Sequence, residues 1–146
     1  MNGQKGFTLV ESLIVLAVFM IISTVTVFSL KPQNSTIQIQ AFLTQLKTDL
    51  YYAQNYALTH NQDVSVVITP SKYRYIVYVY SANQEKIIQR NYDTSFYFIP
   101  GSLPLNFTYQ ANGNVNKFGT FFIKAKKKTY QITFLIGRGR FYFVEK

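Results

Sequence analysis

The feature that most constrains this chain is an apolar run of 24 residues from Phe7 to Leu30, in which Glu11 is the only charged residue. As a helix, the run would rise roughly 36 Å, enough to cross a hydrocarbon core of about 30 Å. A lone carboxylate costs about 3 kcal/mol near the bilayer centre, and such a residue is a functional hypothesis by default. Glu11 lies near the start of the run, where this cost is smaller. The sequence therefore predicts a transmembrane helix with a functional carboxylate near one end.

A short polar leader, residues 1–6, precedes the run and contains one lysine, Lys5. A cleaved secretory signal and a plain membrane anchor are the alternative interpretations. A secretory signal usually has a shorter apolar run and a cleavage site of small residues. Here the run continues to Leu30 without such a site, which favours a different kind of processing.

The junction Gly6-Phe7-Thr8-Leu9-Val10-Glu11 resembles the processing site of type IV prepilins and pseudopilins. The resemblance implies that a prepilin peptidase cleaves after Gly6 and N-methylates Phe7. It also implies that Glu11 faces the terminal amine of a neighbouring subunit during assembly. The implied partners are other pseudopilins, the prepilin peptidase, an assembly ATPase and a platform membrane protein. The implied location is the cell membrane, with the C-terminal domain outside, and then a pseudopilus at the cell surface.

The length and composition allow one modest domain after the apolar run. The chain has 146 residues and no cysteine, so disulfides and thiolate metal sites are excluded. Its formal net charge is +9, which can favour DNA, anionic lipid or an anionic wall polymer. Simple solubility explains the same charge.

The apolar pattern is interrupted at Pro32, which would kink or end the helix. Ser35 and Gln38 then form a capping-box pattern, and we expect a second helix to about Asn61. Its apolar stripe should lie on a sheet, with Gln38, Gln45, Lys47, Asp49 and Asn55 on other faces. The members of the stripe are Ile39, Phe42, Leu43, Leu46, Leu50, Ala53 and Ala57.

From Asp63 onward the pattern changes to the period of two that is typical of strands. We expect strands at 64–69, 73–80, 86–92, 105–109, 118–125, 129–136 and 141–144, and an extended segment at 96–99 that leads into a loop. The fold class is therefore α+β, a long bent N-terminal helix packed on an antiparallel β-sheet domain. The expected divisions are a leader at 1–6, a transmembrane or filament-core helix at 7–30, a kink and amphipathic helix at 31–61, and the sheet domain at 62–146.

Three segments after residue 30 carry a second resemblance: Phe42–Ala57, Phe107 to Ile123 with Gly113 and Gly119, and Ile132 to Arg140 with Gly137. They resemble minor pseudopilins of type II secretion and their counterparts in the competence pseudopilus of Gram-positive bacteria. This resemblance implies a structural subunit of a pseudopilus that serves uptake of external DNA. Two alternatives stay open. One is a minor subunit of type II secretion or of a type IV pilus with a protein partner. The other is a membrane-tethered module that binds DNA or another anion.

Catalytic chemistry is poorly supported by the sequence. The single histidine, His60, is expected at a helix end, and the acidic residues are scattered without the paired spacing of general acid–base catalysis. Asp93 beside Asn91 and Thr94 offers too few oxygen ligands for calcium, so we expect no metal, no cofactor and no enzyme activity.

The densest charge run consists of Lys124, Lys126, Lys127 and Lys128, placed on one expected hairpin. It is interpreted either as a solvated hairpin tip or as a contact to DNA phosphates. The 25 aromatic residues are expected to form mainly core and cross-strand pairs.

Overall fold

The structure is a computed structural model that describes residues 8–29, 34–81, 84–137 and 139–146, without the side chains of residues 25–29 and 34–35. It forms two compact units, Met1–Gln40 and Ala41–Lys146. Each unit is described by itself below. The expected kink at Pro32 and the side chain of the expected cap Ser35 lie outside the described residues.

The first unit contains helix α1, Leu9–Ser29. Its start is set by Thr8, whose carbonyl accepts hydrogen bonds from the backbone N–H groups of Glu11 at 3.1 Å and Ser12 at 3.2 Å. The large apolar side chains of α1 from Leu9 to Ile22 are exposed. Within the part of the chain that the structure describes, no helix reaches the length and hydropathy needed to cross a membrane. Phe7 and Leu30, the ends of the expected span, lie outside that part.

The second helix, α2, runs from Asn34 to His60, close to the expected 35–61. It ends because Asn61 adopts a left-handed conformation, with φ of 51°. The Gln62 N–H then donates to the Ala57 carbonyl at 3.2 Å. This is the 6→1 bond of a Schellman motif, in which asparagine can replace the usual glycine.

The expected apolar stripe of α2 is largely confirmed by burial. Its buried members are Ile39, Leu43, Leu46, Leu50, Ala53 and Ala57. Phe42 is half-buried and stacks at 4.2 Å, centroid to centroid, on Phe96. One expectation was wrong, because Asp49 was placed on another face of the helix but is only 4% exposed.

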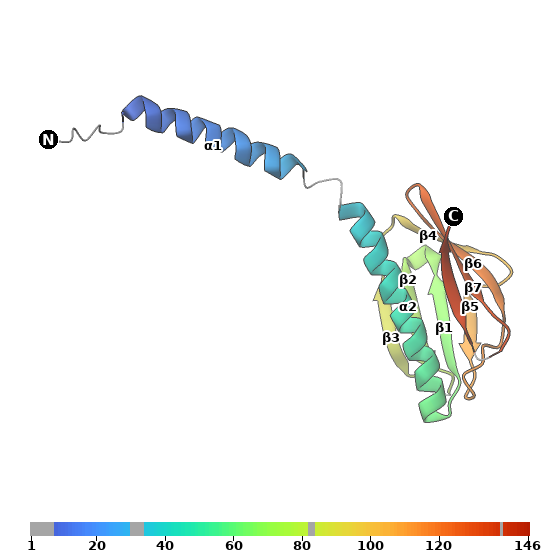
Figure 1. Cartoon of the computed structure of the whole chain (residues 1–146). Coiled ribbons are helices and arrows are strands. Elements are labelled where there is room, and N and C mark those ends of the chain that lie inside the picture. Colours follow the sequence, from blue (N-terminus) through green and yellow to red (C-terminus); the bar gives the residue numbers. More distant parts are fainter. Residues whose placement is uncertain (1–7, 30–33, 82–83, 138) are drawn as a thin grey trace. The chain divides into compact units, whose positions relative to one another are not determined.

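Within the described residues eight strands follow, and they form two antiparallel sheets, a division that the expected antiparallel β-sheet domain did not specify. The first sheet has the order β3-β2-β1-β5, with β1 Val64–Thr69, β2 Arg74–Val79, β3 Lys86–Asn91 and β5 Asn106–Tyr109. The second has the order β4-β6-β7-β8, with β4 Phe96–Pro100, β6 Gly119–Ala125, β7 Lys128–Phe134 and β8 Phe141–Glu145. Figure 1 shows the second half of α2 running alongside these strands. The α+β fold class is confirmed.

Most strand bounds agree with the sequence pattern, and the differences have local causes. Strand β1 covers the expected 64–69. Strand β2 starts one residue later than expected because a 3₁₀ turn, η1 (Pro70–Lys72), precedes it and Tyr73 takes a φ of 46°. Pro100, expected in a loop, instead ends β4. Among the described residues β4 is an edge strand with a partner on one side, and proline is tolerated in such a strand.

Aromatic rings join the two sheets and α2 within the second unit. Phe107 of β5 lies 4.8 Å from Phe134 of β7, centroid to centroid. Phe134 in turn lies 5.2 Å from Phe141 of β8, and Tyr51 of α2 lies 4.6 Å from Phe141. The expectation that aromatics mainly build the core is confirmed for these rings, except Tyr51, which is 47% exposed.

Candidate functional site

The N-terminal residues that the sequence singles out lie at the start of α1. Glu11 is in the first turn of the helix, where a carboxylate is favoured by the helix dipole. Its backbone N–H also approaches Thr8 Oγ1 at 3.4 Å, so Thr8 and Glu11 have the spacing of a capping box. Glu11 is exposed. Gly6 and Phe7 lie outside the described residues.

The lysine run lies on the β6–β7 hairpin. Its turn is tighter than expected, because β7 begins at Lys128 and only Lys126 and Lys127 separate the strands. Lys126 has a φ of 56°, a conformation that usually favours glycine in a two-residue turn. Lys124, Lys126 and Lys127 are exposed and Lys128 is half-buried. The structure thus keeps the four lysines at one end of the second sheet.

Lys128 is the member of the run that forms an ion pair among the described residues. Its Nζ lies 2.6 Å from Glu145 Oε1 of β8, and this hydrogen bond raises the pKa of Lys128. The side chains are 44% and 45% exposed, so solvent screens the pair and its contribution to stability is small. Glu145 also lowers the positive potential of this end of the sheet.

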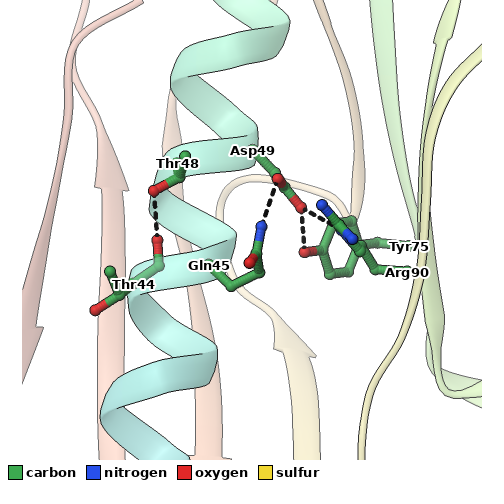
Figure 2. A network of polar contacts seen from close by, with 6 residues as sticks. All are labelled: Thr44, Gln45, Thr48, Asp49, Tyr75 and Arg90. Atoms are coloured by element: carbon green, nitrogen blue, oxygen red, sulfur yellow. Dashed lines mark hydrogen bonds and ion pairs between the residues drawn. The ribbon is translucent and has the colours of Figure 1, made fainter.

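A polar cluster that sequence reasoning missed lies between α2 and the first sheet (Figure 2). The Asp49 carboxylate accepts hydrogen bonds from Tyr75 Oη at 2.7 Å, from Gln45 Nε2 at 2.8 Å and from Arg90 Nε at 3.2 Å. The donors come from β2, from the preceding turn of α2 and from β3. We call these four residues the Asp49 clamp.

The Asp49 clamp explains how a carboxylate can be buried in this domain. An unpaired buried charge is very costly, whereas a charge that is paired and hydrogen-bonded can be accommodated. Burial and the bond to Asp49 raise the pKa of Tyr75 well above its usual value, so this phenol stays a donor. The four-residue spacing of Gln45 and Asp49 could have predicted the contact between these two residues. No sequence pattern could have predicted the partners on β2 and β3.

Other polar groups do not gather into a catalytic or metal-binding arrangement within the described residues. No three histidine, aspartate or glutamate side chains converge there. Asp93 instead accepts a hydrogen bond from the Ser95 backbone N–H at 2.8 Å, and hydrogen bonding to Ser95 lowers its pKa. His60 is exposed and stacks on Tyr56 with a centroid distance of 3.9 Å, as a solvated residue at a helix end can.

Comparisons with known proteins concern the N-terminal motif, the whole sequence and the fold. Residues 1–27 match the family model described as the prokaryotic N-terminal methylation motif. The chain is 26% identical over 140 residues to a protein named "Competence protein ComGD" from Bacillus subtilis (strain 168), covering 96% of this chain and 93% of that protein. The structure of the minor pseudopilin EpsH from the type 2 secretion system of Vibrio cholerae superposes with a TM-score of 0.54 at 17% identity, over 75% of this chain and 95% of that one. The likeness to the solved structure shows a shared fold.

Proposed function

We infer from these relationships that this chain, a structural protein with the type IV prepilin methylation motif and a pilin-like fold, is a minor pseudopilin of a competence pseudopilus that serves uptake of external DNA. The observation that carries the proposal is the similarity to a competence protein along almost the whole chain. The methylation motif makes the chain a membrane-anchored prepilin, and subunits of this kind are structural proteins and not enzymes.

In this proposal the prepilin peptidase cleaves between Gly6 and Phe7 and methylates the new N-terminus. Phe7 then directly precedes Thr8, the residue that opens α1. Glu11 lies in the first turn of α1, after Thr8, and is exposed, so a neighbouring subunit's amine can reach its carboxylate. The pairing neutralises two charges that would otherwise both be costly in an apolar filament core.

The exposed apolar surface of α1 supports a helix that is covered by lipid before assembly and by other pseudopilin helices afterwards. A contiguous apolar surface of this kind marks a membrane or protein contact. The exposed side chains include Leu9, Val10, Leu13, Ile14, Val15, Leu16, Val18, Phe19, Met20, Ile21 and Ile22. Assembly would be driven by the cytoplasmic ATPase through the platform membrane protein.

A direct role in DNA binding is a second candidate function, supported by the lysines of the β6–β7 hairpin. Lys124, Lys126 and Lys127 are exposed together, and neutralising phosphates would give weak, sequence-independent binding. Lys128 would contribute less to DNA binding, because its ammonium group already forms an ion pair with Glu145. A secretion or pilus subunit with a protein partner is the other alternative, and the shared fold with a secretion pseudopilin is compatible with it.

The experiment is a gene deletion in the source organism, complemented with the native chain or with Gly6→Val, and scored by transformation with external DNA. We expect the deletion to abolish transformation, the native chain to restore it, and Gly6→Val to accumulate as uncleaved precursor without restoring it. The N-terminal sequence of the mature protein checks the cleavage. Normal transformation of the deletion strain with impaired secretion would instead favour the secretion alternative.

A further inference from the structure

The outer face of the first sheet carries a groove that none of the functions above uses. Strand residues alternate between faces. Tyr75 faces α2 and bonds to Asp49, so Tyr78 and its cross-strand partner Ser65 lie on the opposite face. There a groove of about 190 Å³ is lined by residues of β1, β2, β5 and the loop that follows β5. We call it the outer groove.

The floor of the outer groove is a pair of hydroxyl groups. Ser65 and Thr108 are directly opposite on β1 and β5, and their hydroxyl oxygens lie 2.9 Å apart. Ser65 is only 4% exposed. The two hydroxyls carry two hydrogens, and their mutual bond uses one of them. The described residues supply no further partner, so one O–H donor and several acceptor positions are left for a molecule in the groove.

The walls of the outer groove are different on its two sides. Tyr78 and Tyr80 of the β2 side form one wall, and Tyr80 is 68% exposed. Asn116 and Lys117 form the other. Asn116 is fixed by two bonds, because its Oδ1 accepts from the Thr108 N–H at 2.9 Å and its own N–H donates to the Thr108 carbonyl at 2.9 Å. Its side-chain NH₂ group is thereby held at the groove.

The outer groove continues past Tyr80 into a second hollow of about 250 Å³, which shares Tyr80, Thr108 and Asn116 with it and adds Asp63 and Gln110. The charged residues in the two linings are Lys117 and Asp63, whose charges cancel. A polyanion such as DNA needs several cations along its path. The outer groove therefore suits an uncharged ligand.

We propose that the outer groove binds a neutral glycan segment built from hexose or N-acetylhexosamine units. A sugar ring offers hydroxyl groups that donate and accept hydrogen bonds, and these match the hydroxyls of Ser65 and Thr108 and the amides of Asn116 and Gln110. Its C–H face is apolar and packs on flat aromatic rings such as Tyr78 and Tyr80.

The test uses the full chain labelled with ¹⁵N in phosphocholine micelles, which contain no sugar headgroup. Chitotetraose and cellotetraose are titrated separately, and the amide signals of Ser65, Thr108 and Asn116 are followed. We expect these signals to shift with a Kd of about 1 mM. A stronger effect of chitotetraose would identify N-acetylated units, and a stronger effect of cellotetraose would identify plain hexoses.

Two variants and a matched control locate the site. Tyr80→Ala removes an exposed ring and Thr108→Val removes a hydroxyl at nearly constant shape, and each should weaken binding roughly five-fold. Tyr97→Ala removes a tyrosine that is 56% exposed on the second sheet and should leave binding unchanged. Absence of shifts with both glycans at about ten times the expected Kd overturns the proposal. So does equal weakening by Tyr97→Ala, or a larger shift of the same amides by duplex DNA. None of these outcomes contradicts the competence role, which the transformation assay tests separately.

Discussion

The phenolic oxygen of Tyr75 lies 2.7 Å from the carboxylate of Asp49, so a strand of the first sheet and the middle of α2 are joined by a buried hydrogen bond. The two residues are 26 positions apart in the sequence. Of the three groups that bond to Asp49, only the Tyr75 hydroxyl is itself buried. The bond therefore stabilises the packing of helix on sheet more than the half-exposed ion pair with Arg90 does.

This difference leads to a ranking of variants. Asp49→Ala leaves the Tyr75 hydroxyl buried without an acceptor and should lower the free energy of unfolding by about 1–3 kcal/mol. Arg90→Gln removes the charge of an arginine side chain that is 51% exposed and should cost less, because solvent screens that side of the pair and the Tyr75 and Gln45 bonds to the carboxylate remain. Urea denaturation of the two variants measures the ranking. An Arg90→Gln loss as large as that of Asp49→Ala would contradict the assignment of the main effect to Tyr75.

A second prediction concerns a contact between two loops. A Cβ added to Gly139 would lie 2.6 Å from the Gly113 carbonyl oxygen and 2.7 Å from Gln54 Nε2. Gly139 also has a φ of 57°, whereas Gly137, with a φ of 82°, has nothing within 4 Å of such a Cβ. Gly137→Ala should therefore cost only the backbone strain of about 1–2 kcal/mol. Gly139→Ala should cost clearly more, and thermal unfolding of both variants would show whether it does.

The third prediction concerns alkaline pH. Burial raises the pKa of Tyr92 to about 12, and burial also raises the pKa values of Tyr75 and Tyr109. An unfolded tyrosine ionises near pH 10. Above about pH 10 the unfolded chain thus binds fewer protons than the folded chain. The contribution of these tyrosines to the free energy of unfolding is therefore fully present below that pH and decreases as pH rises.

Tyr92→Phe should make this alkaline decline shallower, because it removes one phenol that is protonated only in the folded state at pH 10–12. The substitution leaves no partner unpaired, since the Tyr92 hydroxyl has none among the described residues. Tyr97→Phe, at an exposed position, is the control. Denaturation midpoints measured from about pH 8 to 12 test both, and an unchanged decline in Tyr92→Phe would contradict the prediction.

The fourth prediction concerns assembly. Glu11→Gln removes the charge that we propose to pair with the neighbouring amine, at a cost of several kcal/mol in an apolar filament core. Cleavage after Gly6 should continue, while incorporation into sheared pseudopilus fractions should fall. Ser12→Ala, one position further along the exposed α1, is the matched control. Normal incorporation of Glu11→Gln would make Glu11 only a capping-box residue.

The fifth prediction concerns the β6–β7 hairpin and DNA. If Lys126 and Lys127 each contact one phosphate, changing both to Gln should lower the slope of log K against log salt by roughly two. Lys128→Gln should change the slope less, because Lys128 already pairs with Glu145. A fluorescence titration of the full chain in micelles with duplex DNA at several salt concentrations measures these slopes. A slope that the double change leaves unaltered would assign these lysines to solubility.

Local sequence patterns predicted most of the elements of this fold. The period of two located β1 at its observed bounds, because alternation depends only on neighbouring residues. The apolar spacing predicted the buried stripe of α2 for the same reason. The split into two sheets was missed, because it depends on β4 pairing with β6 and not with β3, and such distant pairing leaves no local pattern.

Tertiary partners also explain what was missed around the sites. Asp49 looked like a residue of a polar face until Tyr75 and Arg90 were placed beside it. The outer groove is assembled from β1, β2, β5 and the loop that carries Asn116, and no single segment indicates it. The lysine hairpin was recognisable because its members are adjacent in sequence, but the pairing of Lys128 with Glu145 joins strands that are neighbours only in the folded sheet.

The Asp49 clamp also has a mechanical consequence. Tyr75 and Arg90 belong to two neighbouring strands, while the carboxylate belongs to α2 (Figure 2). A displacement of the helix by one turn, about 5.4 Å along its axis, would break both bonds together and leave a charge in an apolar layer. A force along the axis of α2 therefore acts on both hydrogen bonds to Asp49 at the same time, so they resist it together and do not break one after the other. The Asp49 clamp thus resists sliding of α2 along its axis and transmits tension on the helix to the first sheet.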